Sequence, residues 1–174
     1  IMPVRVLDES GSGTWASVAA GVRYAADNGA QVINLSLGGG ATAPVVTSAI
    51  QYAVSRGAIV VIASGNEAAN QPGFPANLAN QAGVIAVGAV NSANQLANFS
   101  NDAGMFPLNY VVAPGVNIYS TTPGNTYRVF NGTSMATPHV AGVAALMLSA
   151  NPTLTPAQIT QILTQTARGG VVTA

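Results

Sequence analysis

The chain has 174 residues, enough for one domain with a sizeable core, and a net charge of zero with only 6% charged residues. Its five basic residues are dispersed arginines, so the composition argues against nucleic acid as a partner. It has no cysteine, which excludes disulfides and thiolate zinc sites, and its longest apolar run, Val140–Leu148, is too short to cross a membrane.

The first part of the chain predicts a strand followed by a helix. Residues Met2–Leu7 are rich in β-forming types, and a flexible Ser/Gly loop at residues 10–13 follows them. Thr14 has the side chain of a helix N-cap, and apolar residues then recur at helical spacing as far as Gly29. We therefore expect a strand at the start of the chain and a helix that ends near Gly29.

Three further elements complete a strand-helix-strand pattern. Val32–Leu37 and Ala58–Ala63 are apolar runs of the kind found in strands that are covered on both faces. Between them a helix is expected over Pro44–Arg56, where Gly57 ends it. Strands and helices that alternate at this spacing form right-handed βαβ units, so the sequence predicts an α/β fold with a parallel sheet.

The second half of the chain continues with strands, a hairpin and two helices. A loop rich in Asn, Pro and Gly covers residues 64–80. The strands expected after it are Val84–Val90, Tyr110–Ala113, and a hairpin that pairs residues 118–121 with 127–130. Thr155 opens a capping box for a last helix that ends near Ala167. We find neither a repeat nor a linker and expect one α/β domain over residues 1–174.

The most specific stretch is NGTSMATPHVAG, residues Asn131–Gly142. Gly132 permits a sharp turn and Thr133 has a capping side chain, so Ser134 is expected in the first turn of a helix. The field at that end of a helix stabilises negative charge on an acyl group bound to the serine. The ring of Pro138 would press against the carbonyl of Ser134, four residues back, and distort the helix start. We interpret Ser134 as a nucleophile.

This stretch resembles the nucleophile motif of the subtilisin-like serine proteases. The similarity extends from Arg5 to about Ala167 and is nearest to the thermitase-like branch. The resemblance implies a three-layer fold with a mostly parallel sheet flanked by helices, here as a partial domain, and a serine endopeptidase that forms an acyl-enzyme on Ser134. The Gly-x-Ser-x-Gly elbow of lipases and esterases fits poorly, because Ala136 occupies its last position.

The resemblance also implies an oxyanion hole. Asn66 follows the predicted strand Ala58–Ala63, at the edge of the sheet where the sites of parallel α/β folds gather. In this family the matching asparagine donates to the oxyanion together with the backbone N–H of the nucleophile. Asn66 and Ser134 are therefore the two predicted catalytic residues.

Substrate-binding positions follow from the same resemblance. Residues 36–38 would align an extended peptide by main-chain hydrogen bonds, and residues 11–13 would form the opposite edge. A primary pocket would accept large apolar side chains, with Glu67 at its rim to tolerate a basic one. The match also implies a cis peptide bond at Phe74-Pro75. The expected set is Gly11, Gly13, Trp15, Val18, Ser36, Leu37, Gly38, Ala63, Ser64, Gly65, Glu67, Gly73, Phe74 and Asn131.

A serine nucleophile needs a base, which a third group orients. The one histidine, His139, lies five residues beyond Ser134, where its ring would point elsewhere on the helix, and the family has a histidine here that is not part of its triad. The five acids lie in no motif like that of the triad aspartate. We therefore hypothesise that this chain is the C-terminal portion of a serine endopeptidase, and that an absent N-terminal segment supplies the triad Asp and His.

A second reading stays open: an inactive pseudoprotease or fragment that binds extended peptides along residues 36–38. The expected partners are a peptide or protein substrate and the N-terminal part of the protease, with no nucleic acid and no membrane. The chemistry requires no cofactor, although structural Ca²⁺ could use loop carbonyls near Ala76–Val84. Family resemblance predicts a secreted protein.

Overall fold

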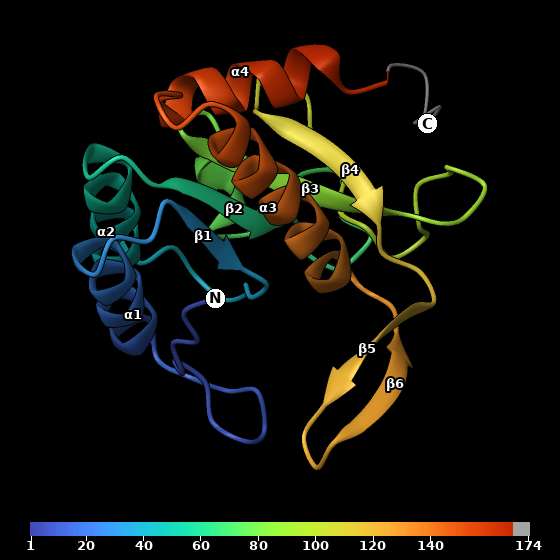
Figure 1. Ribbon diagram of the computed structural model, residues 1–174. Coiled ribbons are helices and arrows are strands. Elements are labelled where there is room, and N and C mark those ends of the chain that lie inside the picture. The colour runs from blue at the N-terminus through green and yellow to red at the C-terminus, as the bar shows by residue number, and fades with distance from the viewer. Residues whose placement is uncertain (169–174) are drawn as a thin grey trace.

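A parallel four-stranded sheet forms the middle layer of the protein, whose computed structural model describes residues 1–168 (Figure 1). The strands lie in the order β1 (Val32–Leu35), β2 (Ile59–Ala63), β3 (Val84–Val90) and β4 (Tyr110–Pro114). Every residue of β2 and β3 is buried, as expected for central strands of a covered sheet. The end of the predicted domain, residues 169–174, lies outside the described residues.

Helices cover both faces of the sheet (Figure 1). Their bounds are α1 (Trp15–Asp27) and α2 (Pro44–Ser55) on one face, and α3 (Thr133–Ala150) and α4 (Pro156–Thr166) on the other. Neighbouring side chains of a strand point to opposite faces. Accordingly, Val60 and Ile62 of β2 pack with α1 and α2, whereas Ile59 and Val61 pack with α3 and α4. The predicted three-layer α/β fold, with helices flanking a parallel sheet, is confirmed.

Local sequence signals set the helix starts. The side chain of Thr14 accepts a hydrogen bond from the backbone N–H of Ser17 at 3.1 Å and caps α1. Thr155 and Gln158 form the predicted capping box of α4, with Pro156 at the first helical turn. These caps satisfy backbone N–H groups for which the first turn of a helix has no internal acceptor.

An antiparallel hairpin of β5 (Ile118–Thr122) and β6 (Thr126–Phe130) projects from the layers (Figure 1). Every residue of β6 is exposed, and the rings of Tyr119 and Tyr127 stack with centroids 5.3 Å apart. The remaining element is a short 3₁₀ helix, η1 (Ala76–Leu78), between β2 and β3. The hairpin matches the prediction for this stretch.

Two strand predictions differ from the structure. Residues Met2–Leu7 do not form a strand, although Val4 and Val6 pack against the core beneath α1 and α2. A strand requires backbone pairing with a neighbour, which an apolar composition does not provide by itself. β1 ends earlier than predicted, at Leu35, and its residue Asn34 is exposed. β1 is one of the two edge strands of the sheet, and the exposure of Asn34 shows that the prediction of a strand covered on both faces is wrong here.

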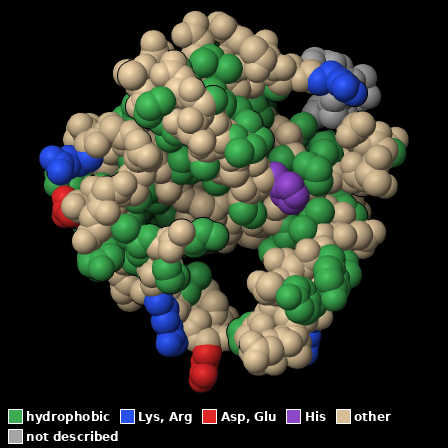
Figure 2. All heavy atoms as spheres, viewed as in Figure 1, with side chains coloured by type: hydrophobic (Ala, Val, Ile, Leu, Met, Phe, Trp, Pro, Cys, Tyr) green, Lys and Arg blue, Asp and Glu red, His purple; other side chains and the backbone are tan. Residues whose placement is uncertain are grey.

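The surface carries few charges. Figure 2 shows isolated basic and acidic side chains near the margins of one face and hydrophobic side chains between them. The same view shows a notch between the loop ahead of α1 and the β5–β6 hairpin. Over residues 1–168, none of the helices combines the length and the apolar character needed to cross a lipid bilayer.

Candidate active site

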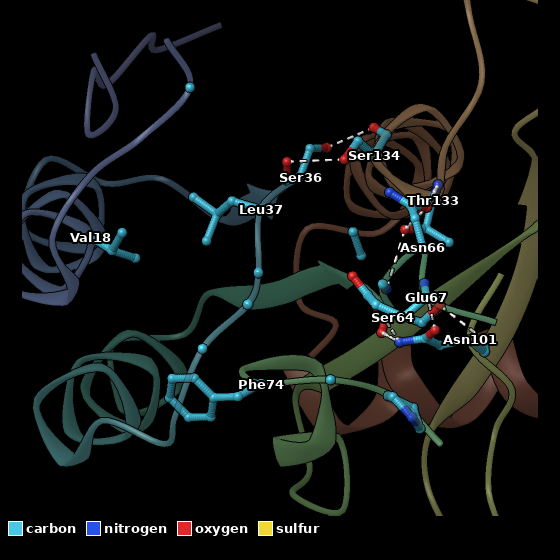
Figure 3. Close-up of a pocket in the computed structure, with 18 of the residues that line it drawn as sticks. Val18, Ser36, Leu37, Ser64, Asn66, Glu67, Phe74, Asn101, Thr133 and Ser134 are labelled. Carbon is cyan, nitrogen blue, oxygen red and sulfur yellow. Dashed lines mark hydrogen bonds between the residues drawn. The ribbon is translucent and has the colours of Figure 1, made fainter. Parts of the chain in front are cut away.

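A groove of about 880 Å³ lies at the carboxyl ends of β1 and β2. It is bounded by the loop ahead of α1, by residues 36–40 after β1, by residues 63–74 after β2, and by the start of α3. Sites of parallel α/β folds lie at this edge because the loops that follow the strands meet there. Segments that are far apart in the sequence thus face one hollow (Figure 3).

Ser134 is the second residue of α3 and lies partly buried in the groove wall. Its Oγ donates a hydrogen bond to the carbonyl oxygen of Ser36 at 3.2 Å, and Ser36 Oγ donates to the carbonyl oxygen of Ser134 at 2.8 Å (Figure 3). The backbone N–H of Ser134 belongs to the first helical turn, where an α-helix has no internal acceptor for it. The helix therefore leaves this N–H available to a bound group.

Asn66 lies on the loop after β2, and its side chain is fixed by the start of α3. Its Oδ1 accepts from the N–H of Thr133 at 2.8 Å and from Thr133 Oγ1 at 3.0 Å. A backbone N–H can only donate, so the atom that meets it is the amide oxygen, and Nδ2 remains as a free donor in the groove lining. A Cβ built on Gly132 would lie 3.6 Å from Nδ2 and 3.7 Å from the Ser134 nitrogen. The two expected oxyanion donors thus border the same space.

Thr133 joins the loop after β2 to α3, and the expectation that it caps this helix is wrong. Gly132 is the N-cap, and Thr133 is the first helical residue and is fully buried. Its hydroxyl donates to Asn66 Oδ1 and accepts from the N–H of Gly65 at 3.2 Å. The hydroxyl does not cap its own helix because it bonds to the neighbouring loop, which it holds against the nucleophile.

Asn101 organises the same loop from behind, and the sequence analysis missed it. Its side chain is only 1% exposed. Oδ1 accepts from the N–H groups of Glu67 at 3.0 Å and Ala69 at 2.9 Å. Nδ2 donates to the carbonyl oxygen of Ser64 at 3.0 Å and to Glu67 Oε2 at 2.8 Å (Figure 3). A Cβ on Gly65, whose φ is +113°, would collide with this amide, so the position requires glycine.

The groove brings together every predicted substrate-binding residue except Asn131. The Oδ1 of Asn131 instead accepts from the N–H of Asn117 at 2.6 Å, next to the hairpin. The lining also contains Ser12, from the predicted edge at residues 11–13, and Thr133, which was expected only as a cap. The sequence analysis did not single out the other lining residues: Leu7, Gly39, Gly40, Ala69, Gln71, Pro72 and Asn101. Contact of the lining with a substrate stays a prediction.

Aromatic side chains shape one wall of the groove. The rings of Trp15 and Phe74 meet edge to face with centroids 5.1 Å apart. Val18, which is buried, lines the same groove (Figure 3 labels Val18 and Phe74). The peptide bond between Phe74 and Pro75 is cis, as the resemblance implied. The N–H of Gly39 donates to the carbonyl oxygen of Phe74 at 3.0 Å and holds the loop after β1 against this wall.

A carboxylate orders the opposite edge of the groove. Asp8 Oδ1 accepts from the N–H and hydroxyl of Ser10, at 2.9 and 2.6 Å, and from the N–H of Ser12 at 3.0 Å. Hydrogen bonds from Ser10 and Ser12 to the ionised carboxylate hold the pKa of Asp8 below its ordinary value. The loop that carries Gly11 and Gly13 is therefore folded around this side chain.

The described residues place no base beside the hydroxyl of Ser134. His139 is exposed, and its ring Nδ1 lies 2.9 Å from the carbonyl oxygen of Met135 on its own helix. The hydroxyl of Ser134 bonds to the carbonyl oxygen of Ser36, not to an imidazole. Of the acids, Glu67 lines the groove but is bound by Asn101. The described residues thus hold the predicted nucleophile and the predicted oxyanion donors, and the Ser134 hydroxyl makes no hydrogen bond to a histidine or a carboxylate among them.

The residues near the expected calcium site do not fit a cation. Asn109 Nδ2 donates to the carbonyl oxygens of Gln81 and Val84 at 3.0 and 3.2 Å, and the N–H of Asn109 donates to the carbonyl oxygen of Ala79 at 2.9 Å. A calcium ion takes six to eight oxygens at about 2.3–2.6 Å. Over residues 1–168, no three or more His, Cys, Asp or Glu side chains group as metal ligands. Amide donors meet these carbonyl oxygens instead.

Comparisons with known proteins agree with this geometry. The model of the subtilase family, Peptidase_S8, matches residues 1–174. The chain is 48% identical to "Subtilisin" from Bacillus pumilus over 168 residues, which cover 94% of this chain and 59% of that protein. It is 48% identical to "Alkaline elastase YaB" from Bacillus sp. (strain YaB) over 165 residues, which cover 94% of this chain and 42% of that protein.

The solved structures give the same result. The fold matches that of a cold adapted subtilisin-like serine proteinase with a TM-score of 0.88 at 40% identity, covering 97% of this chain and 60% of that one. It matches Sphericase with a TM-score of 0.80 at 33% identity, covering 92% of this chain and 57% of that one. The chain thus spans between two fifths and three fifths of the relatives it matches.

Proposed function

This chain belongs to the subtilase family, and we propose that it is the nucleophile-bearing part of a serine endopeptidase. In this proposal Ser134 attacks the carbonyl carbon of a peptide bond and forms an acyl-enzyme. The triad His and Asp come from polypeptide outside these 174 residues. The observation that carries the proposal is that Asn66 Nδ2 and the Ser134 nitrogen both lie within 4 Å of one point beside Gly132.

The reaction follows from these atoms. Ser134 Oγ forms a bond to the carbonyl carbon while its proton passes to the base, and the carbonyl oxygen gains negative charge. Asn66 Nδ2 and the N–H of Ser134 donate to that oxygen, in the positive field of the α3 N-terminus. The base then gives the proton to the leaving amine as the peptide bond breaks. Water hydrolyses the ester by the same steps and restores the hydroxyl.

The rigidity of the donor supports this assignment. An oxyanion hole is effective when its donors are held in place before charge develops. The oxygen of Asn66 accepts two hydrogen bonds from the buried Thr133, and Thr133 also accepts from the N–H of Gly65. The amide is therefore oriented by the same helix that carries the nucleophile.

The exposed apolar surface supports a second segment. α3 (Thr133–Ala150) contains no charged residue, yet its side chains Val143 and Leu146 are 46% and 71% exposed. Helices on a protein surface normally present polar residues to water. β1 (Val32–Leu35) has a strand on one side only. We expect the N-terminal part of the protease to cover this helix face and strand edge and to bring the base to Ser134.

The groove suits an extended peptide with an apolar side chain. Main-chain groups at residues 36–38 and 11–13 would pair with the two edges of the substrate backbone. The pocket beside Gly65 is lined by Ala63 and other small residues, which leaves room for a large apolar side chain. Glu67 at its rim would also accept a basic one, although its carboxylate is bound by Asn101.

The second candidate is a peptide-binding pseudoprotease. It is favoured by one observation: the hydroxyl of Ser134 donates to a main-chain carbonyl oxygen, that of Ser36, and not to a base. A serine held there without a base reacts no faster than an ordinary alcohol. Such a protein would bind extended peptides along residues 36–38 and release them unchanged.

Measuring peptide hydrolysis by the full-length protein that contains this chain distinguishes the endopeptidase from the pseudoprotease. Ser134→Ala should reduce cleavage of a chromogenic peptide to background. Asn66→Ala should lower kcat by roughly 10²–10³, the size of effect known for one oxyanion donor in subtilisin itself. Asn98→Ala, an exposed asparagine outside the groove, should leave kcat unchanged. Peptide binding without any hydrolysis by the wild-type protein would favour the pseudoprotease.

The proposal extends to the location and the isolated chain. We expect the whole protein to be secreted, as family resemblance implies, which fractionation of a producing culture would check. The 174-residue chain by itself should hydrolyse peptides at a rate near background, because it holds one exposed histidine and no base at Ser134.

A further inference from the structure

Pro138 leaves a gap in the hydrogen bonding of α3 at the nucleophile itself. In an α-helix the carbonyl of residue i accepts from the N–H of residue i+4. For Ser134 that donor position is Pro138, which lies inside α3 and has no N–H. The carbonyl oxygen of Ser134 therefore has no regular helical partner. A backbone carbonyl in a packed site is normally satisfied by some other donor.

Ser36 provides that donor. Its Oγ donates to the carbonyl oxygen of Ser134 at 2.8 Å, from a residue directly after β1 and 98 positions earlier in the chain. Asn34 Nδ2 donates in turn to Ser36 Oγ at 2.9 Å, so the hydroxyl receives one hydrogen bond and gives one. A hydroxyl that accepts and donates in this way is polarised and has a defined direction.

We infer that Ser36 is a positioning residue for the nucleophile: its hydroxyl replaces the main-chain donor that Pro138 lacks, and Asn34 orients that hydroxyl. This inference rests on the proposed protease function. It goes beyond the main-chain role expected of residues 36–38, because it assigns work to two side chains. Ser36 thereby connects the edge strand β1 (Val32–Leu35) to the first turn of α3.

Ser36 and Ser134 are joined by two hydrogen bonds, which we call the clamp, and catalysis must break one of them. Ser134 Oγ donates to the carbonyl oxygen of Ser36 at 3.2 Å, so each of the two residues donates its hydroxyl to the carbonyl of the other (Figure 3). When the Ser134 hydroxyl donates its hydrogen bond to a base instead, the bond to Ser36 breaks, and the carbonyl oxygen of Ser36 is free to accept from a substrate N–H. The bond from Ser36 Oγ to the Ser134 carbonyl persists and holds the helix start while the hydroxyl changes partner.

A double-mutant cycle on the full-length protein tests this inference. Ser36→Ala removes the donor and should lower kcat about tenfold with KM nearly unchanged, whereas Ser36→Thr keeps a hydroxyl and should stay within about threefold of wild type. Pro138→Ala restores a backbone N–H at the position that Ser134 needs. In the Pro138→Ala background, Ser36→Ala should therefore cost less than about threefold, because the two donors replace each other.

Substitutions of Asn34 test the direction of the hydroxyl. Asn34→Ala removes a donor to Ser36 and should lower kcat only about threefold. Asn34→Asp introduces a carboxylate that attracts the Ser36 hydrogen away from the Ser134 carbonyl, so it should lower kcat as much as Ser36→Ala. A purely structural role for Asn34 predicts the opposite ranking, because aspartate preserves its shape.

The outcomes are distinguishable from failure of the protease proposal. If Ser36→Ala costs the same in both backgrounds, or if Asn34→Asp is milder than Asn34→Ala, the inference is overturned. The same cycle read from the thermal unfolding midpoint of the full-length protein requires no catalysis. If Ser36→Ala and Pro138→Ala are coupled in the unfolding midpoint but the protein hydrolyses no peptide, the clamp is upheld and the protease function is rejected. If the protein hydrolyses peptides but the two substitutions are coupled neither in kcat nor in the midpoint, the clamp alone is rejected.

Discussion

The connection between β2 and β3, residues 64–83, has two halves, and each is held by one asparagine from outside it. The first half lies at the groove, where the buried Asn101 side chain makes four hydrogen bonds. The second half leads to the start of β3, where the partly exposed Asn109 bonds the carbonyl oxygens of Gln81 and Val84. The side-chain amide of Asn101 bonds both N–H groups and oxygen atoms of its loop. The side-chain amide of Asn109 bonds carbonyl oxygens only.

The difference shows how a site loop is built. Because Asn101 satisfies the backbone of the first half from behind, the front of that loop remains free to present Asn66 to the groove. The second half, residues 75–83, contributes no residue to the groove lining. Its carbonyl oxygen at Gln81 meets an amide in the region where the family resemblance predicted a cation. We therefore expect the first half to depend on one buried side chain, and the second to tolerate replacement when another positive partner is provided.

The largest effect is expected from Asn101→Ala. It leaves the N–H groups of Glu67 and Ala69 without the partner that they have here, and it removes one of the two donors to the carbonyl oxygen of Ser64, which keeps the N–H of Gly73. Groups that lose a partner on burial cost about 1–3 kcal/mol each. The free energy of unfolding should fall by about 3 kcal/mol in denaturant titrations. Exposed Asn98, three residues earlier, gives the matched control, for which Asn98→Ala should cost less than about 0.5 kcal/mol. A loss below about 1 kcal/mol for Asn101→Ala would remove the contrast between the two halves.

A smaller effect is expected from Asn109→Asp. The change removes both amide donors and places a carboxylate beside the carbonyl oxygens of Gln81 and Val84, which should cost about 1–2 kcal/mol without divalent ions. Carbonyl and carboxylate oxygens together suit Ca²⁺. Millimolar Ca²⁺ should therefore raise the unfolding midpoint of Asn109→Asp more than that of wild type or of Asn109→Ala. An equal response in all three proteins would show that the amide does not take the place of a cation.

The smallest effect concerns Tyr110, which links the two halves because it follows Asn109 and its hydroxyl donates to the carbonyl oxygen of Asn101 at 2.8 Å. Burial raises the pKa of Tyr110 above its ordinary value. Its contribution to stability is complete below about pH 10, the unfolded value, and is lost as the pH rises through the raised pKa.

Tyr110→Phe should therefore cost about 1 kcal/mol at neutral pH and show a weaker loss of stability above about pH 10 than wild type. Tyr52, whose pKa is raised by its hydrogen bond to Asp27, titrates in both proteins, so the difference between them isolates Tyr110. Urea titrations at several pH values measure this difference. Parallel curves for the two proteins would contradict the assignment.

The elements that the sequence predicted well are those with local causes. The apolar run Val84–Val90 forms β3, and the capping box at Thr155 and Gln158 starts α4. The motif around Ser134 is contiguous and specific, which is why it carries a catalytic assignment, and that assignment stays a prediction. The structure then brought Asn66 to the same end of α3, although contact of either residue with a substrate is still a prediction.

What the sequence could not predict depends on distant partners. Asn101 bonds Glu67 across 34 positions, and a single asparagine in a loop gives no pattern that announces such a contact. Thr133 is a residue type that often caps helices, but its N–H and its hydroxyl both donate to Asn66 on the loop after β2. Met2–Leu7 has the composition of a strand, but strand formation depends on a neighbour with which it can pair.

Covalent labelling with a fluorophosphonate, mapped by peptide mass spectrometry, tests the central claim most directly. The full-length protein should carry one adduct, on Ser134, and should lose it in Ser134→Ala, whereas the 174-residue chain by itself should remain unlabelled. An adduct on another residue, or a wild-type full-length protein that stays unmodified while it binds peptides, would contradict the claim that Ser134 is a nucleophile activated by a base from outside this chain.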